Sequence, residues 1–179
     1  MYEHEIRKLK KSCIKHNIPF DFFPVNDQGT WEKNCALKPK IIATAMDKWH
    51  REGKNIVYLD ADARIMRYPV LFDNFDADFG AHYLAGQELL SGTLFFRNCQ
   101  KCYHLVYLWH ELLRESKGPV WDQVVLQHCI REYGVKLELK VKNLPPTYTQ
   151  IFDTMEGTGK PIIKHMQASR RAKANASSI

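Results

Sequence analysis

Apolar residues recur at helical spacing in four segments of the chain. Residues 3–16 place Ile, Leu and Cys side chains on one face and charged side chains elsewhere, which predicts an amphipathic helix. Similar spacing predicts helices over 101–115 and 122–133. A further helix is expected from Lys38-Pro39, where proline suits a first turn, to Gly53, which ends it.

Extended patterns separate these predicted helices. Residues 56–59 (IVYL) are apolar without a charge, which is typical of a central strand covered on both faces. Residues 84–92 (LAGQELLSG) are expected to form a loop between two strands. The predicted strands cover residues 18–25, 54–59, 77–83, 93–97 and 135–141.

Strands that alternate with helices predict an α/β fold, with a mixed, mainly parallel sheet flanked by helices. The 179 residues, 45% of them hydrophobic, suffice for one compact core. We therefore expect a single domain over residues 1–168. Residues 169–179 (SRRAKANASSI) form a basic, polar C-terminal tail.

Composition bears on the cellular compartment of the protein and on the charge of its partners. No window is apolar enough to span a membrane, and no apolar segment follows the basic N-terminal residues as in a signal peptide. Five scattered cysteines favour reduced thiols, so a cytoplasmic location is expected. The net charge of +6 favours anionic partners, but a solvated basic surface explains it equally well.

Two carboxylates follow the apolar run 56–59, in the sequence IVYLDADA. In open α/β sheets, ligands bind beyond the carboxyl ends of the strands, and residues two apart project to the same side. Asp60 and Asp62 would therefore face one small volume and repel each other unless a cation lies between them. Oxygen ligands suit Mg²⁺ or Mn²⁺, which complete their shells with water and phosphates. The pair predicts a metal–diphosphate site, although aspartates also end strands simply as turn residues.

The segments around this motif resemble, in order, the landmarks of metal-dependent nucleotide-sugar glycosyltransferases with the GT-A fold. The resemblance is strongest to the small nucleotide-diphospho-sugar transferase group, and it runs from about Gly29 to Arg171. It implies a GT-A-like domain and a nucleotide-sugar donor. The matching segments are GTWEKNCALKP, VYLDADARI, LLSGTLFFRN, WDQVVLQ, LPPTYTQIFD and PIIKHMQASR.

The resemblance implies a role for each residue of a metal and diphosphate site. Asp60 and Asp62 would contact the metal and the sugar diphosphate, with Asp62 the direct ligand, and His165 would complete the metal shell. Lys164 and Arg170 would neutralise the diphosphate leaving group. On spacing alone, His165 also fits an ordinary exposed or hydrogen-bonded histidine.

The resemblance also implies contacts with the sugar, the acceptor and the nucleotide. Asp122 would contact sugar hydroxyls or act as general base on the acceptor hydroxyl, with Gln123 beside it, and Lys38 would border the nucleotide. An ordinary helix cap explains Asp122 about equally well. The segment Ser91-Gly92-Thr93 is expected to form a turn beneath the sugar or acceptor, or simply a turn before a strand. Trp31 would either stack or simply pack, and packing in the core is expected.

One part of the family pattern is missing. Relatives carry a first strand that contributes to the nucleobase pocket, whereas this sequence opens almost directly with the first helix. The family implies uridine. Either the first strand belongs to a part of the protein outside this sequence, or the base pocket is built in another way.

Together these features predict an enzyme that transfers a sugar from a UDP-sugar to an acceptor hydroxyl with Mn²⁺ or Mg²⁺. The acceptor is a glycan, a protein or DNA. Alternatives are a glycosyltransferase of hydroxylated DNA bases and a nucleic-acid-binding protein without catalysis, both suggested by the basic residues Arg170, Arg171 and Lys173. Two weaker alternatives are a zinc protein built on Cys99-x-x-Cys102 and a scaffold without activity.

Overall fold

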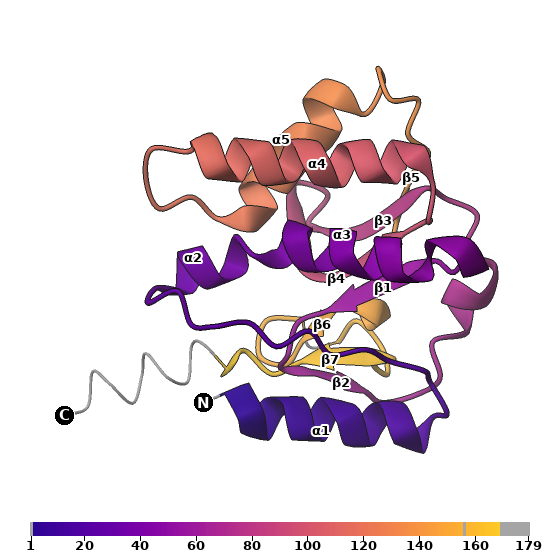
Figure 1. The fold of residues 1–179 in the computed structure, drawn as a ribbon. Coiled ribbons are helices and arrows are strands. Elements are labelled where there is room, and N and C mark those ends of the chain that lie inside the picture. Colours follow the sequence, from indigo (N-terminus) through magenta and orange to yellow (C-terminus); the bar gives the residue numbers. More distant parts are fainter. Residues whose placement is uncertain (1, 156, 169–179) are drawn as a thin grey trace. The chain divides into compact units, whose positions relative to one another are not determined.

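The computed structural model describes residues 2–155 and 157–168 (Figure 1). The tail predicted over 169–179 lies outside the described residues. The α-helices are α1 (Tyr2–Lys15), α2 (Trp31–Cys35), α3 (Lys38–Trp49), α4 (Gln100–Glu115) and α5 (Asp122–Tyr133). The strands are β1 (Ile56–Leu59), β2 (Ala63–Ile65), β3 (Phe79–Leu84), β4 (Glu88–Phe96), β5 (Val141–Asn143), β6 (Gln150–Ile151) and β7 (Ile163–His165). Three short 3-10 helices are η1 (His50–Glu52), η2 (Val70–Asn74) and η3 (Pro146–Tyr148).

Contacts divide the chain into two compact units that interleave along the sequence. Unit 1 consists of the described parts of residues 1–21, 59–75 and 144–179, and unit 2 consists of residues 22–58 and 76–143. Each unit has its own sheet, β2-β7-β6 in unit 1 and β1-β4-β3-β5 in unit 2. Strand β1 belongs to unit 2 up to Tyr58.

The core of unit 2 is built from large side chains of its sheet and helices. Strand β3 pairs antiparallel with β4 and parallel with β5. Phe79 and Phe96 face each other across β3 and β4 with ring centroids 5.1 Å apart. Trp109 of α4 is fully buried, and its indole N–H donates to the carbonyl oxygen of Asp122 at 2.9 Å. This bond satisfies the polar group of a core tryptophan and fixes the start of α5.

Unit 1 is a small sheet covered by α1. The apolar face predicted for this helix is confirmed at Leu9 and Cys13, which are buried, but not at Ile14, which is 65% exposed. Helix α1 packs against β2. Two polar contacts fix this packing. The Ser12 hydroxyl accepts the Ile65 N–H at 3.1 Å, and the Arg64 guanidinium pairs with a carboxylate on α1.

The four longer α-helices are predicted well from the sequence, α2 is not predicted, and the strands are predicted less well. Helix α5 has the predicted bounds, and α3 continues through η1 to Gly53, whose φ of 61° ends it. The strand predicted at 18–25 is wrong, because this segment has no regular structure; Pro19 and Pro24 cannot donate to a strand ladder. The strand predicted at 135–141 is also wrong, because turns occupy 134–138 and β5 begins only at its last residue.

A tight hairpin replaces the loop that was predicted over 84–92. Ala85 and Gly86 have φ values of 50° and 74°, and the Gln87 N–H donates to the Leu84 carbonyl oxygen at 3.0 Å. Two consecutive positive φ values define a two-residue turn that suits the twist of a hairpin. Strand β4 therefore begins at Glu88 and takes up most of the predicted loop.

The predicted α/β class with a mixed sheet and flanking helices is confirmed. In unit 2, α4 packs between α3 and α5, and α5 packs on β4. The prediction that β1 is a central strand is wrong. It ends the strand order of its sheet, and Val57 is 36% exposed.

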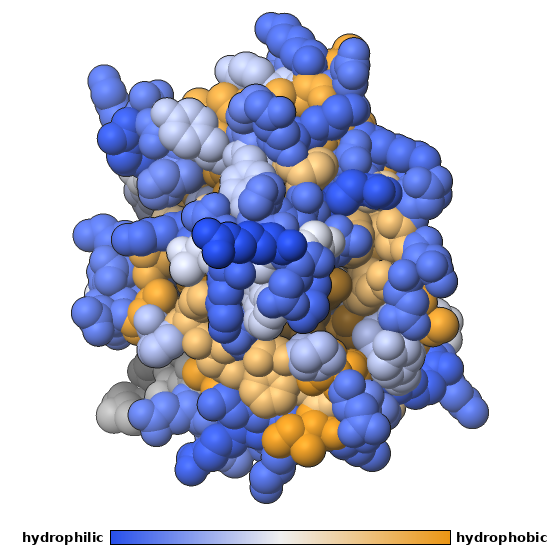
Figure 2. All heavy atoms as spheres, turned by 45° about the vertical axis from the view of Figure 1, so that its right-hand side comes forward, coloured by the Kyte–Doolittle hydropathy of each residue, from blue (hydrophilic) through white to orange (hydrophobic). Residues whose placement is uncertain are grey.

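Hydrophilic side chains cover much of the face shown in Figure 2, with apolar patches between them. In the described part of the chain, no helix combines the length and apolar character that crossing a membrane requires.

Candidate functional site

The β2–β7 pairing brings Asp62 next to His165. Strand β2 begins directly after Asp62, and the antiparallel register places Ala63 opposite His165. The Asp62 Oδ1 atom lies 3.6 Å from the His165 Nδ1 atom. Two residues that sequence reasoning assigned to one site, although they lie far apart in the chain, are therefore neighbours in unit 1.

Backbone groups hold the Asp62 carboxylate in place. Its Oδ2 atom accepts the Ala168 N–H at 2.9 Å, and its carbonyl oxygen accepts the Met166 N–H at 3.3 Å. His165 is buried, and the Asp62 side chain is 14% exposed. The segment after β7 thus wraps around the carboxylate and orients it.

The surroundings of Asp62 favour its ionised form. Burial raises the pKa of this carboxyl, but the contact with His165 and the Ala168 N–H lower it. Electrostatic attraction to His165 and to Arg64 lowers it further, so that the pKa of Asp62 lies below the ordinary value of 3.8. Asp62 is therefore an anion at neutral pH, as a metal ligand must be.

The other residues predicted for this site are Asp60, Lys164 and Arg170. The carbonyl oxygen of Asp60 accepts the Ala63 N–H at 2.9 Å, which closes the turn that carries the two aspartates. Lys164 pairs with Arg64 across β2 and β7, and successive strand residues point to opposite faces. Strand geometry therefore does not direct Lys164 toward the Asp62–His165 pair. Arg170 lies outside the described residues.

The Asp62–His165 pair supplies two donor atoms of the kinds that bind metal ions. With bonds of about 2.1 Å, adjacent ligands of an octahedral ion are about 3.0 Å apart and opposite ones about 4.2 Å. The two donor atoms are 3.6 Å apart, so they would have to approach each other to bind one ion as adjacent ligands. Within residues 2–155 and 157–168, no three His, Cys, Asp or Glu side chains form a group that could hold an ion. Two protein ligands still suit Mg²⁺ or Mn²⁺, because phosphate oxygens and water can supply the rest.

A second cluster, in unit 2, joins three of the predicted residues. The Lys38 ammonium lies 3.0 Å from the Asp122 Oδ2 atom and donates to the Ser91 hydroxyl at 2.9 Å. All three side chains are buried, Asp122 to 2% exposure. We call these residues the lysine cluster. A buried ion pair with a further hydrogen bond is costly to assemble in a core, which makes this cluster a candidate for function.

Three different elements supply the lysine cluster. Lys38 is the first residue of α3, Ser91 lies within β4, and Asp122 is the first residue of α5. The helix-cap interpretation of Asp122 is wrong, because the N-cap of α5 is Trp121 and makes no side-chain capping bond. The Asp122 carboxylate turns instead toward Lys38.

The remaining predicted residues lie in regular secondary structure. The turn predicted at Ser91-Gly92-Thr93 is wrong, because all three residues lie inside β4. Thr93 is fully buried, but the register of β4 against β3 shifts between Leu90 and Phe95, so strand alternation does not assign it to the face of Ser91. Gln123 is not part of the lysine cluster, because its amide donates to the Glu88 carboxylate at 2.7 Å.

Sequence reasoning missed two contributors. Tyr58 lies just before the aspartate motif, and the Lys38 ammonium is 5.7 Å from the centre of its ring. This cation–π contact was foreshadowed only by an aromatic residue near the end of the strand. The backbone N–H of Ala168 could not have been found, since a main-chain donor leaves no mark in a sequence.

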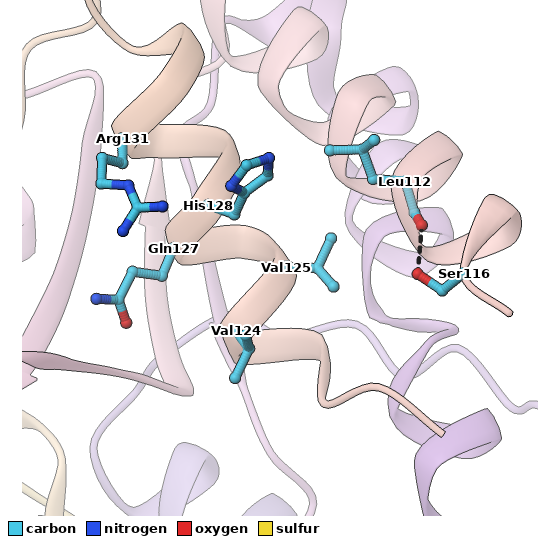
Figure 3. A pocket seen from close by; sticks show the side chains of 7 residues that line it. All are labelled: Leu112, Ser116, Val124, Val125, Gln127, His128 and Arg131. Atoms are coloured by element: carbon cyan, nitrogen blue, oxygen red, sulfur yellow. Dashed lines mark hydrogen bonds between the residues drawn. The ribbon is translucent and has the colours of Figure 1, made fainter. Parts of the chain in front are cut away.

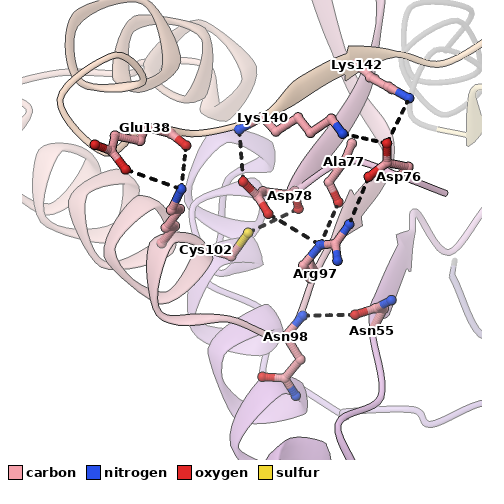
Figure 4. A network of polar contacts seen from close by, with 11 residues as sticks. Asn55, Asp76, Ala77, Asp78, Arg97, Asn98, Cys102, Glu138, Lys140 and Lys142 are labelled. Atoms are coloured by element: carbon pink, nitrogen blue, oxygen red, sulfur yellow. Dashed lines mark hydrogen bonds and ion pairs between the residues drawn. The ribbon is translucent and has the colours of Figure 1, made fainter.

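Acidic residues neutralise part of the basic surface of unit 2 (Figure 4). Asp76 lies within ion-pair distance of Arg97, Lys140 and Lys142. The hydrogen bond and charge of Lys140 lower the pKa of Asp76, with smaller contributions from the other two cations. These pairs reduce the positive charge that this face could offer to a nucleic acid.

The zinc alternative finds no support in the geometry. Cys102 is buried, and its thiol donates to the Asp78 carbonyl oxygen at 3.1 Å. Burial raises the pKa of the Cys102 thiol, which works against the thiolate that zinc requires. His104 is exposed.

Comparison with known proteins defines the class of this protein. Residues 5–174 match the family of nucleotide-diphospho-sugar transferases, and the chain belongs to that family. It is a glycosyltransferase that uses a nucleotide-diphospho-sugar donor. The family predicted from the sequence landmarks is thereby confirmed.

Two solved structures resemble the fold. One is a glycosyltransferase involved in the glycosylation of the major capsid of PBCV-1, with a TM-score of 0.73 and 14% identity over 100% of this chain and 93% of that chain. The other is mouse xyloside xylosyltransferase 1 in its apo form, with a TM-score of 0.49 and 14% identity over 94% of this chain and 74% of that chain. A search of the curated proteins finds no match.

Proposed function

We propose that this glycosyltransferase transfers a sugar from a UDP-sugar to an acceptor hydroxyl, with Mn²⁺ or Mg²⁺ bound at Asp62 and His165 and assisted by Asp60. The observation that carries the proposal is the 3.6 Å approach of the Asp62 and His165 donor atoms. The resemblance at the sequence level supports uridine as the base. A cytoplasmic location is part of the same proposal, supported by the scattered cysteines.

Metal binding in the proposed reaction depends on the Asp62 carboxylate, which is ionised and oriented without the metal. The lowered pKa of Asp62 keeps its charge available at neutral pH, and the Ala168 N–H fixes one oxygen so that the other faces His165. A bound divalent cation would supply charge stabilisation for the departing nucleoside diphosphate. The chain itself provides an anion and an imidazole whose positions are fixed by backbone contacts.

The lysine cluster supports a role for Asp122 with a hydroxyl group. Lys38 compensates its buried charge at 3.0 Å. Among the described residues, the Asp122 Oδ2 atom has an ion-pair partner but no hydrogen-bond donor in good alignment. We assign this oxygen to a hydroxyl of the sugar or acceptor, as an orienting acceptor or a general base. Lys38, which also donates to the Ser91 hydroxyl, holds the carboxylate while it serves that role.

Thermal stabilisation by nucleotides tests the donor assignment. Melting temperatures would be measured with UDP, GDP, CDP and ADP, each with and without Mn²⁺, because a ligand that binds only the folded state raises the melting temperature. We expect an increase with UDP that requires Mn²⁺. An equal increase without the metal would contradict the metal assignment, and a preference for another nucleotide would contradict uridine.

The variant Asp62→Asn tests the metal ligand itself. The amide keeps the shape and can still accept the Ala168 N–H, but it removes the charge that a divalent cation requires. We expect loss of the Mn²⁺-dependent increase with UDP and of sugar transfer. Asp73→Asn is the matched control, because it removes the same charge from an exposed residue of unit 1. Undiminished metal dependence in Asp62→Asn would overturn the proposal.

A further inference from the structure

Two tryptophans form an exposed pair in unit 2. Trp31 is the first residue of α2, whose cap is the Thr30 hydroxyl, and Trp121 is the N-cap of α5. Their ring centroids are 6.0 Å apart and their planes meet at 86°. Trp121 is 51% exposed. The expectation that Trp31 packs in the core is therefore wrong, because it is partly exposed and contacts a surface aromatic.

The position of the pair relates it to the lysine cluster. Trp121 directly precedes Asp122, and the two residues begin the same helix. A ligand that rests on the Trp121 ring therefore lies next to the residue assigned to a hydroxyl. Large exposed aromatic surfaces are costly in water and commonly mark binding sites.

A pocket lies between α4 and α5, and its lining on α5 begins three residues after Trp121 (Figure 3). Val124 lies one turn after Trp121, and its N–H donates to the Trp121 carbonyl oxygen at 3.1 Å. Val124 also lines the pocket, whose volume is about 460 Å³. Val125 and His128 project from α5 toward α4 in Figure 3. The aromatic pair and the pocket are therefore neighbours along the start of α5, and we call them together the track.

The track has little net charge. Arg131 lines the pocket but is paired with the Glu132 carboxylate at 2.8 Å. Gln127 also lines it, yet its amide holds the β3–β4 hairpin through Gln87 and Leu89. The surface left for a ligand combines apolar rings and methyl groups with the His128 imidazole.

This chemistry matches a neutral carbohydrate better than a nucleotide or a nucleic acid. A pyranose ring has an apolar face of C–H groups that packs on an aromatic face, and hydroxyls at its rim that bond to imidazole or indole N–H groups. A phosphate-bearing ligand would need unpaired cations, which the track does not concentrate. We propose that the Trp31–Trp121 pair and the α4–α5 pocket bind an oligosaccharide acceptor, with a sugar ring stacked on Trp121. The statement that the bound oligosaccharide is the acceptor rests on the proposed function. The statement that the track binds an oligosaccharide does not.

Indole N–H signals in a nitrogen-15 NMR spectrum test the track directly. The chain has four tryptophans, and single-residue variants assign their signals. Neutral pentasaccharides of glucose, xylose, mannose and N-acetylglucosamine would be titrated into the whole protein. We expect at least one of them to shift the Trp31 and Trp121 signals in a saturable way. The signal of Trp49 should stay in place.

Variants identify the groups that bind. Trp121→Ala should weaken binding of that saccharide about fivefold or more, as the loss of a central aromatic contact does, and His128→Ala should weaken it as well. Trp121→Phe keeps a ring and should retain part of the affinity, which protects the test against a misfolded alanine variant. Trp49→Ala is the control, because this tryptophan contacts Lys48 and Lys54 at the other end of α3.

The outcomes separate this inference from the donor assignment. If no saccharide moves the two signals, the track is not an acceptor site, whatever UDP and Mn²⁺ do to the melting temperature. If a short double-stranded DNA moves them and no saccharide does, the inference is also overturned. Saccharide binding without any nucleotide-induced stabilisation would support the track and count against the proposed donor.

Discussion

Asp62 and Asp122 are both shielded carboxylates, but different groups stabilise their charges. Asp62 relies on His165, a backbone N–H and a more distant guanidinium. Asp122 relies on one ammonium at 3.0 Å. The first arrangement leaves an oxygen facing an imidazole, as a metal ligand would, and the second holds an oxygen against a cation. The two carboxylates therefore differ in the groups that compensate their charge.

The pH dependence of stability should report the Asp62 interactions. Because the pKa of Asp62 is lower in the folded than in the unfolded chain, its ionised form stabilises the fold above about pH 4, the unfolded value. This contribution should disappear as the pH falls from about 4 through the folded pKa. Urea unfolding of wild type and Asp62→Asn between pH 7 and 2.5 would measure it. The difference in unfolding free energy should be largest near neutral pH and shrink in acid, and a constant difference would contradict the pKa assignment.

Removing one member of the Lys38–Asp122 pair should be strongly destabilising. Breaking a buried ion pair leaves an uncompensated charge and typically costs about 3–5 kcal/mol. We expect Lys38→Met and Asp122→Leu each to lower the free energy of unfolding by about this amount. The double variant should lose less than the sum of the two, because it leaves neither charge behind. Additive losses in a urea-unfolding cycle would mean that the two charges do not interact.

At the scale of elements, helices were predictable and the β3–β4 hairpin was not. A helix such as α5 carries a repeating apolar face over twelve residues, and local spacing reveals it. The hairpin turn uses Ala85-Gly86 where asparagine-glycine would have signalled it. Alanine in a left-handed conformation is held there by the ladder of β3 and β4, which no local pattern records.

The hairpin turn offers a prediction with opposite signs at adjacent residues. Asparagine tolerates the φ of 50° at Ala85 better than alanine does, so Ala85→Asn should raise the free energy of unfolding by roughly 0.5–1 kcal/mol. Gly86→Ala should lower it by about 1 kcal/mol. Strain alone causes this loss, because no atom lies within 4 Å of the added Cβ. Thermal or urea unfolding measures both, and a loss of stability in Ala85→Asn would contradict the turn assignment.

At the scale of the whole molecule, the two units differ in how much their cores depend on the C-terminal segment. Unit 1 is assembled from three separate segments, and β7 lies between β2 and β6. The main core cluster belongs to unit 2 and draws only on residues 42–141. Loss of the C-terminal segment therefore removes the centre of one sheet and leaves the other core complete.

Hydrogen exchange of a fragment that ends at Asn143 would test this difference. Without β7, we expect the amides of α1 and β2 to lose their protection, since their sheet partner is gone. The amides of α4 around Leu105 and Trp109 should stay protected, because their contacts are in unit 2. The full-length chain, measured in parallel, supplies the reference for both groups. Equal loss of protection in α4 and α1 would show that unit 2 also requires the C-terminal segment.

The sequence by itself determined the helices, the α/β class, the family and most members of the two clusters. These features rest on local periodicity and on residue types that carry chemistry wherever they are placed. Tertiary structure decided which residues meet. It placed Ala63 opposite His165, joined Lys38 to Asp122 and Ser91, and paired Trp31 with Trp121. The physical reason is that strand register and helix packing bring together residues far apart in the chain. Such contacts are set by the free-energy minimum of the whole folded molecule, and no local segment determines them.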